Sequence, residues 1–152
     1  MTTITVRGVR LFPASRLFYI GGPCVMESPR MVLEHAGAIR AACRRAGVPC
    51  VFKASFDKAN RMSLESYRGP GLAAGLEILR EVRRRFPDLP LLTDIHEPSQ
   101  AEPVAEVVDI LQIPAFLCRQ TDLVVAAART GRPVNIKKGQ FMDPRAMEYI
   151  AK

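Results

Sequence analysis

Short apolar runs alternate with longer amphipathic stretches along most of this chain. The runs lie at residues 17–20, 50–52, 89–93, 107–112 and 133–136. Between them, apolar residues recur at steps of three and four, as they do on one face of a helix. Such alternation is typical of consecutive β-α units with a parallel sheet. A β-hairpin is predicted before the first unit.

Local signals predict where several helices begin and end. Ser28-Pro29 is typical of a helix N-cap followed by proline in the first turn, and Gly47 is typical of a helix end. Ser99 with Glu102 forms a capping-box pattern. The first helix is predicted to bury one face, formed by Val32, Ala36, Ile39, Cys43 and Ala46. Further helices are predicted around residues 72–82 and 121–129 and from residue 143 onward.

Four polar residues lie at the carboxyl ends of four predicted strands: Lys53, Asp94, Gln112 and Lys137. Repeated β-α units form either a doubly wound open sheet or a (β/α)8 barrel. A barrel gathers the carboxyl ends of all its strands around one opening, whereas an open sheet gathers mainly those beside its switch point. We therefore predict an α/β protein of the (β/α)8 TIM-barrel class, with an N-terminal β-hairpin.

The length of 152 residues is short for that fold. A closed barrel takes about 250 residues and eight strands, and the pattern here supplies the first five β-α units. We expect residues 1–152 to form a single domain, the N-terminal part of a truncated barrel; the alternative is a second copy that covers the open edges. Alone, the chain is expected to expose two sheet edges and much of the apolar barrel interior.

Composition narrows the class of protein. The sequence is 48% hydrophobic and 24% charged, as in soluble globular proteins. It has neither a run of roughly 20 apolar residues nor a secretory signal, so we expect a cytoplasmic protein without a membrane partner.

The net charge of +7 is compatible with nucleic acid or with small phosphorylated substrates. The runs Arg44-Arg45 and Arg83-Arg84-Arg85 end predicted helices, where cations stabilise the helix dipole without any ligand. The basic residues show no aromatic interleaving, so nucleic acid is not an expected partner.

The densest group of polar residues spans residues 53–61, with three cations and three short polar side chains. One interpretation is a solvated charged loop. The other is an anion site, because anionic oxygens require convergent lysine and arginine donors. Lys137 and Lys138 after the fifth strand favour the anion site, since cations at separate strand ends converge in a barrel.

Five stretches carry a family resemblance: FKASFDKANR, SYRGPGL, TDIHEPSQ, LQIPAFLCRQTDL and NIKKGQF. In this order, from about residue 21 to 141, they closely resemble the 3-deoxy-manno-octulosonate 8-phosphate synthases. The related 3-deoxy-heptulosonate phosphate synthases usually carry a K-P-R-T-like motif where this chain has Lys58-Ala59-Asn60-Arg61. That difference favours the eight-carbon product.

The resemblance implies a reaction. It would condense phosphoenolpyruvate with D-arabinose 5-phosphate to 3-deoxy-D-manno-octulosonate 8-phosphate and inorganic phosphate, a step of lipopolysaccharide sugar biosynthesis. Lys137 and Asp94 would be catalytic, and the segment from Phe116 to Arg119 would reach an adjoining subunit of a homotetramer. The substrate-binding residues implied by the resemblance are Lys53, Ser55, Lys58, Asn60, Arg61, Gln112, Ala115, Phe116 and Arg119.

Cys24 indicates the metal-dependent branch of this family, because the metal-independent branch carries asparagine at that position. A thiolate is a ligand for Zn, Fe, Mn or a similar divalent ion, but one ligand cannot hold a metal. The resemblance places the remaining ligands in a part of the enzyme absent from this sequence, and it implies no organic cofactor. From the residue alone, a buried thiol is the alternative.

Other residues are expected to have structural roles. Cys43 and Cys50 fall on predicted core positions, and His96 is interpreted as a hydrogen-bonded structural histidine. Two other functions remain open: another phosphoenolpyruvate-condensing synthase of the heptulosonate type, and an inactive fragment that only self-associates.

Overall fold

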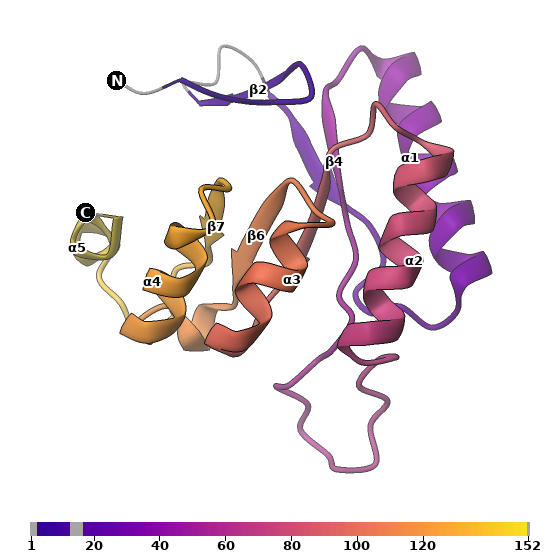
Figure 1. The fold of residues 1–152 in the computed structure, drawn as a ribbon. Helices are drawn as coiled ribbons and strands as arrows, with labels where there is room; N and C mark the ends of the chain where they lie inside the picture. The colour runs from indigo at the N-terminus through magenta and orange to yellow at the C-terminus, as the bar shows by residue number, and fades with distance from the viewer. Residues whose placement is uncertain (1–2, 13–16, 152) are drawn as a thin grey trace.

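A computed structural model describes residues 3–12 and 17–151. β1 (Ile4–Val6) and β2 (Val9–Phe12) form the predicted antiparallel hairpin. A parallel five-stranded sheet follows (Figure 1). Its strands are β3 (Tyr19–Gly21), β4 (Cys50–Lys53), β5 (Leu91–Asp94), β6 (Ile110–Ile113) and β7 (Val134–Ile136).

The strands neighbour one another in chain order, β3-β4-β5-β6-β7, with helical segments between them. The helices are α1 (Pro29–Ala46), α2 (Leu72–Arg85), α3 (Ala101–Ala105), α4 (Thr121–Arg129) and α5 (Met147–Ala151). Short 3-10 turns are η1 (Pro98–Gln100), η2 (Ala115–Leu117) and η3 (Pro144–Ala146). A doubly wound sheet reverses its strand order at a switch point, and this sheet does not. The barrel prediction is confirmed as a five-stranded partial barrel.

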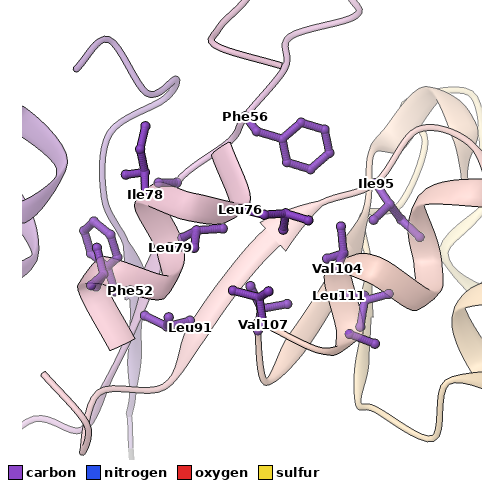
Figure 2. Close-up of a cluster of buried hydrophobic side chains, with 14 of the residues drawn as sticks. Phe52, Phe56, Leu76, Ile78, Leu79, Leu91, Ile95, Val104, Val107 and Leu111 are labelled. Atoms are coloured by element: carbon purple, nitrogen blue, oxygen red, sulfur yellow. The ribbon is translucent and has the colours of Figure 1, made fainter. Parts of the chain in front are cut away.

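The two faces of the sheet have separate cores. Phe52, Leu91 and Leu111 point toward the helices, where they pack with residues such as Leu79 and Val104 (Figure 2). On the opposite face, the hairpin residue Val6 packs against Val51, Leu92 and Ile110, with Ile4, Leu11 and Ile20 around them.

This second core corrects one expectation. Val51 and Leu92 are 0% exposed and Ile110 is 2% exposed, although much of the barrel's apolar interior was expected to face solvent. The hairpin covers this layer of the interior, a contact between distant segments that periodicity does not encode. The two edge strands, β3 and β7, each have one neighbour in the described sheet.

Asp109 holds the hairpin to the sheet. Its carboxylate accepts hydrogen bonds from Arg7 Nε at 2.9 Å and from the Leu91 backbone N–H at 2.8 Å, and it also pairs with Arg83 of α2. Arg7 donates further to the Pro87 carbonyl at 2.9 Å. One buried carboxylate therefore joins the hairpin, a helix and a strand.

Several predicted helix ends are confirmed. Ser28 caps α1 by accepting from the Met31 N–H at 3.2 Å, and Gly47 ends that helix with φ 66°. Asp143 likewise caps the last helical segment by accepting from the Arg145 N–H at 2.8 Å. The arginine runs close α1 and α2 as expected.

Other boundaries differ from the prediction. The capping box at Ser99 is wrong, because Ser99 lies inside η1 and α3 begins two residues later without a side-chain cap. Ala46 is exposed rather than buried, since α1 ends there beyond the core. β6 begins at Ile110, because Val107 and Val108 belong to the turn after α3. None of the described helices is both long and apolar enough to span a membrane.

Candidate functional site

The carboxyl ends of the strands surround a cavity of about 430 Å³. Eight residues singled out from the sequence line it, and they come from the ends of β4, β5, β6 and β7. These eight are Lys58, Asn60, Arg61, Asp94, Gln112, Ala115, Phe116 and Lys137. Segments far apart in the chain therefore place three cations, two amides and one carboxylate around one space.

Asp94 is the centre of a buried network beside the cavity. Its side chain is 4% exposed and lies 3.2 Å from Lys53 Nζ and 3.3 Å from Lys58 Nζ. The Ser55 hydroxyl donates to Asp94 Oδ1 and accepts from Lys53 Nζ at 2.9 Å. Ser55 is 0% exposed, so its hydroxyl contacts residues of the site rather than the cavity.

The charges of this network depend on one another. Burial alone would raise the pKa of Asp94, but the ammonium groups of Lys53 and Lys58, together with the Ser55 hydroxyl, lower it below its ordinary value. Burial lowers the pKa of Lys53, and the Asp94 carboxylate opposes that effect. Asp94 is thus held ionised between two lysines, where it limits the repulsion between them.

Backbone contact between neighbouring strand ends explains a glycine at this site. A Cβ at Gly22, just beyond β3, would lie 1.9 Å from the carbonyl oxygen of Lys53. Only glycine allows the loop after β3 to pass this close to the end of β4. Gly69 has the same role in the β4–α2 loop, where a Cβ would lie 2.3 Å from the Phe56 carbonyl oxygen.

The β4–α2 loop is folded back on itself, which positions Asn60 and Arg61 at the cavity. The Lys58 N–H donates to the Arg68 carbonyl at 2.7 Å, and Arg68 forms a two-pronged pair with Asp57. Arg61 Nε donates to the Tyr67 carbonyl at 3.1 Å. The sequence indicated the cations of this loop but not the pairing that shapes it.

The remaining strand ends differ in how their polar groups are held. Asn135 donates its amide to Gln112 Oε1 at 2.9 Å, so the NH2 end of the Gln112 amide remains as a donor. Lys137 lines the cavity. Its neighbour Lys138 instead donates to the carbonyls of Gly139 and Met142, at 2.9 and 3.2 Å. Only one of the two adjacent lysines therefore faces the site.

Four predicted site residues lie outside the cavity lining: Lys53 and Ser55, which belong to the buried network beside it, and Arg119 and Cys24. Arg119 is exposed beyond η2. Cys24 is also exposed, although it lies close enough to Lys53 to interact electrostatically with its ammonium group. Within residues 3–12 and 17–151, no three His, Cys, Asp or Glu side chains gather as metal ligands. The described residues thus supply one soft donor and do not by themselves fit a metal site.

His96 differs from its sequence-based interpretation. Its ring lines the cavity with Nε2 3.7 Å from Asp94 Oδ2, and it packs edge-on against Phe56. Its Nδ1 is buried with no hydrogen-bond partner among the described residues, so the predicted hydrogen-bonded structural role is wrong for this atom. Burial lowers the pKa of His96, against the opposing effects of Asp94 and Asp57. The sequence signal for a place at the site was the position of His96, two residues after Asp94.

The fold and site together define a barrel protein with a cationic cavity at the carboxyl ends of its strands. The chain belongs to the DAHP synthetase I family, whose model matches residues 6–152.

Curated relatives narrow the similarity further. The chain is 59% identical over 136 residues to the 2-dehydro-3-deoxyphosphooctonate aldolase of Syntrophobacter fumaroxidans, covering 90% of this chain and 47% of the relative. It is 54% identical over 148 residues to the protein of the same name from Hahella chejuensis, covering 97% and 52%. It is also 54% identical over 149 residues to the protein of that name from Magnetococcus marinus, covering 98% of this chain and 52% of the relative. The chain spans about half the length of these relatives.

Proposed function

We propose that this chain forms the substrate-binding half of an enzyme that condenses phosphoenolpyruvate with D-arabinose 5-phosphate. The products are 3-deoxy-D-manno-octulosonate 8-phosphate and inorganic phosphate, in lipopolysaccharide sugar biosynthesis. The observation that carries the proposal is the convergence of Lys58, Arg61 and Lys137 on one cavity, with Lys53 beside it. Each substrate carries a phosphate group, which lysine and arginine donors bind.

The proposed division of roles among the residues follows the family resemblance. Lys53, Lys58 and Lys137 hold phosphoenolpyruvate, while Asn60 and Arg61 on the folded loop hold the sugar phosphate. The enol carbon attacks the sugar aldehyde, water attacks the carbon that bears the phosphate, and the C–O bond to phosphate then breaks. Lys137 polarises or protonates a reacting oxygen, and Asp94 contacts substrate hydroxyls or the attacking water. Positioned cations lower the cost of the charge that develops in such a reaction.

The eight-carbon product is favoured over the seven-carbon one. The motif Lys58-Ala59-Asn60-Arg61 lies at the cavity and lacks the K-P-R-T-like pattern of the heptulosonate synthases. The names of the similar curated proteins agree with this choice. Phosphate release should therefore be faster with arabinose 5-phosphate than with erythrose 4-phosphate, and the opposite preference would overturn the choice of sugar.

The chain offers a matched pair of variants to test the site. Lys137→Ala and Lys138→Ala remove the same charge from adjacent positions, but only Lys137 lines the cavity. In calorimetric titrations with phosphoenolpyruvate, Lys137→Ala should weaken binding at least tenfold, about 1.4 kcal/mol. Lys138→Ala should bind within about twofold of the unaltered chain. Equal losses would mean that net charge, rather than the cavity, attracts the ligand.

A companion measurement separates catalysis from binding. Phosphate release from phosphoenolpyruvate plus arabinose 5-phosphate should require both substrates and should fall with Lys137→Ala. If the 152-residue chain binds phosphoenolpyruvate but releases no phosphate, it is a binding-competent fragment. If it neither binds nor releases, the proposed function is wrong for this chain and the self-associating alternative is favoured, which the two open sheet edges support.

We propose Cys24 as one ligand of a divalent metal such as Zn, Fe or Mn. Its exposure at the end of β3, near Lys53, supports this assignment. The other donors would come from outside the described residues. In a protein that also supplies the other donors, titration with Co²⁺ should give a thiolate charge-transfer absorption that Cys24→Ser abolishes, and an absorption unchanged by Cys24→Ser would overturn the assignment.

We further propose a cytoplasmic homotetramer in which the segment from Phe116 to Arg119 contacts a neighbouring subunit. Phe116 lines the cavity and is 59% exposed. A large apolar side chain that packs against another subunit is exposed in this way when its chain stands alone. Light scattering of the whole protein would measure its mass. Phe116→Ala should weaken the assembly, and an unchanged tetramer would exclude this contact.

A further inference from the structure

Two cysteines meet at the opposite end of the sheet from the candidate site. Cys43 lies in the last turns of α1, and Cys50 is the first residue of β4. Cys50 is 9% exposed within the main core, and Cys43 is half-buried and packs against that core. The Cys43 and Cys50 side chains lie close enough to interact directly, and both line one cavity. The proposed reaction uses neither of them.

The pair borders solvent rather than a closed core. Both thiols line a second cavity of about 250 Å³, together with Arg40 and Arg44. Both arginines donate to Asp88, and Arg40 also lies close enough to Cys50 to interact with it electrostatically. A small neutral oxidant can reach such a cavity.

We propose that Cys43 and Cys50 form a redox-active thiol pair that a two-electron oxidant such as hydrogen peroxide converts to an intramolecular disulfide. The bond would tie the end of α1 to the start of β4. Only six residues separate the two cysteines, and the turn between them is fixed by the Val48 N–H donating to the Cys43 carbonyl at 3.0 Å. The thiols are therefore held together before any oxidation occurs.

The order of events follows from exposure. Cys43 is the more accessible thiol and reacts first: its sulfur attacks one peroxide oxygen, the O–O bond breaks, and sulfenic acid and water form. The Cys50 sulfur then attacks the sulfenic sulfur, the S–S bond forms, and a second water leaves. The two thiols lose two electrons and two protons in total, and peroxide is reduced to two waters.

The resolving role of Cys50 agrees with its surroundings. Burial raises the pKa of the Cys50 thiol to about 11, and the adjacent Cys43 adds to the increase. A thiol of this kind reacts slowly with peroxide from solution, since the thiolate is the nucleophile. It can still attack a sulfenic acid held next to it.

The other cysteines cannot replace either partner. Cys24 follows β3 at the carboxyl end of the sheet, whereas Cys50 begins β4 at the amino end. Cys118 is 0% exposed after η2, beside the candidate site. Oxidation should therefore give one defined intramolecular bond rather than a mixture.

Peptide mapping of the full chain tests the pair directly. The protein is treated with a small excess of hydrogen peroxide, alkylated under denaturing conditions and digested with trypsin. Trypsin cleaves after Arg44 and Arg45, between the two cysteines. A disulfide therefore appears as residues 41–44 linked to residues 46–53, and the count of free thiols falls from four to two. Dithiothreitol should restore all four.

Variants identify which cysteine reacts first. Cys50→Ser should leave a sulfenic acid on Cys43 that dimedone traps, and Cys43→Ser should leave Cys50 reduced over the same time. Cys24→Ser should give the same linked peptide as the unaltered chain. If the unaltered chain gives only disulfides between the Cys24 residues of two molecules, or sulfinic acid on Cys43 with Cys50 still reduced, the proposal is overturned.

Discussion

At the scale of the residue, the site is organised by a single carboxylate. Lys53 and Lys58 both approach Asp94, and their charges would otherwise repel each other in a region with little water. Asp94 keeps both ammonium groups in place without filling the cavity. The same carboxylate lies beside His96, whose side chain is 10% exposed. His96 is therefore sensitive to burial and to the charge of its neighbours.

His96 should make stability depend on pH in a narrow window. Burial places the folded-state pKa of His96 below its ordinary 6.5. The unfolded chain then binds a proton at a higher pH than the folded chain, so the free energy of unfolding falls as pH drops from 6.5 toward the folded-state pKa. Each unit of lowering contributes about 1.4 kcal/mol. Urea unfolding at about pH 7.5 and about pH 5.5 measures the loss.

The second histidine of the chain provides the control. His35 is exposed on α1, with Nδ1 2.7 Å from the Met31 carbonyl oxygen. His96→Gln should remove most of the pH dependence in this window, and His35→Gln should retain it. A His96→Gln variant that loses stability on acidification as much as the unaltered chain would show that another group is responsible.

At the scale of the element, Asp109 connects separate parts of the fold through one side chain. It joins the β1–β2 hairpin, α2 and β5, and its side chain is 8% exposed. Asp109→Asn would leave Arg83 and Arg7 without their anionic partner. Loss of one member of a buried ion pair costs about 3 kcal/mol, and chemical denaturation should show a decrease of this size.

Asp88 is a matched comparison for this change. It also precedes a strand and pairs with two arginines, Arg40 and Arg44, but its side chain is 47% exposed. Exposed ion pairs contribute about 0–1 kcal/mol, so Asp88→Asn should destabilise the protein much less. Equal losses of unfolding free energy would mean that burial beneath the hairpin does not strengthen the ion pairs of Asp109.

The sequence predicted the order of the elements well, because each β-α unit contains its own signal. Short apolar runs and amphipathic helices are local patterns, and α4 matches its predicted range of residues 121–129. The polar residues at four strand ends also predicted where the cavity lies. Both inferences need only local periodicity and the rule that parallel strand ends meet in a barrel.

Features that depend on distant contacts could not be predicted. Asp109 lies within a run that resembles a continuous strand, and its partner Arg7 is 102 positions away. The Ser99 capping box failed for a local reason, because Ser99 lies inside the 3-10 turn η1 rather than at the start of α3. Cys43 and Cys50 each fit a core pattern, but periodicity does not show that their thiols touch. Tertiary contact decides the cases of Asp109 and of the two cysteines.

At the scale of the whole molecule, the hairpin and the open edges have opposite consequences. The hairpin buries the apolar layer of the barrel interior formed by Val51, Leu92 and Ile110, which reduces the surface available for nonspecific association. The edges of β3 and β7 remain unpaired in the described sheet and present backbone groups that another strand can bind. Association of the 152-residue chain should therefore occur through its edges more than through its interior.

Sedimentation of two charge variants tests this distinction. Tyr19 lies on the edge strand β3 and is 47% exposed, whereas Leu64 lies in the β4–α2 loop and is 102% exposed. A lysine on an edge strand opposes pairing with another strand. Tyr19→Lys should shift association to higher protein concentration, and Leu64→Lys should leave it unchanged. The reverse result would identify the loop as the contact, and a monomer at all concentrations would show that the edges are protected without a partner.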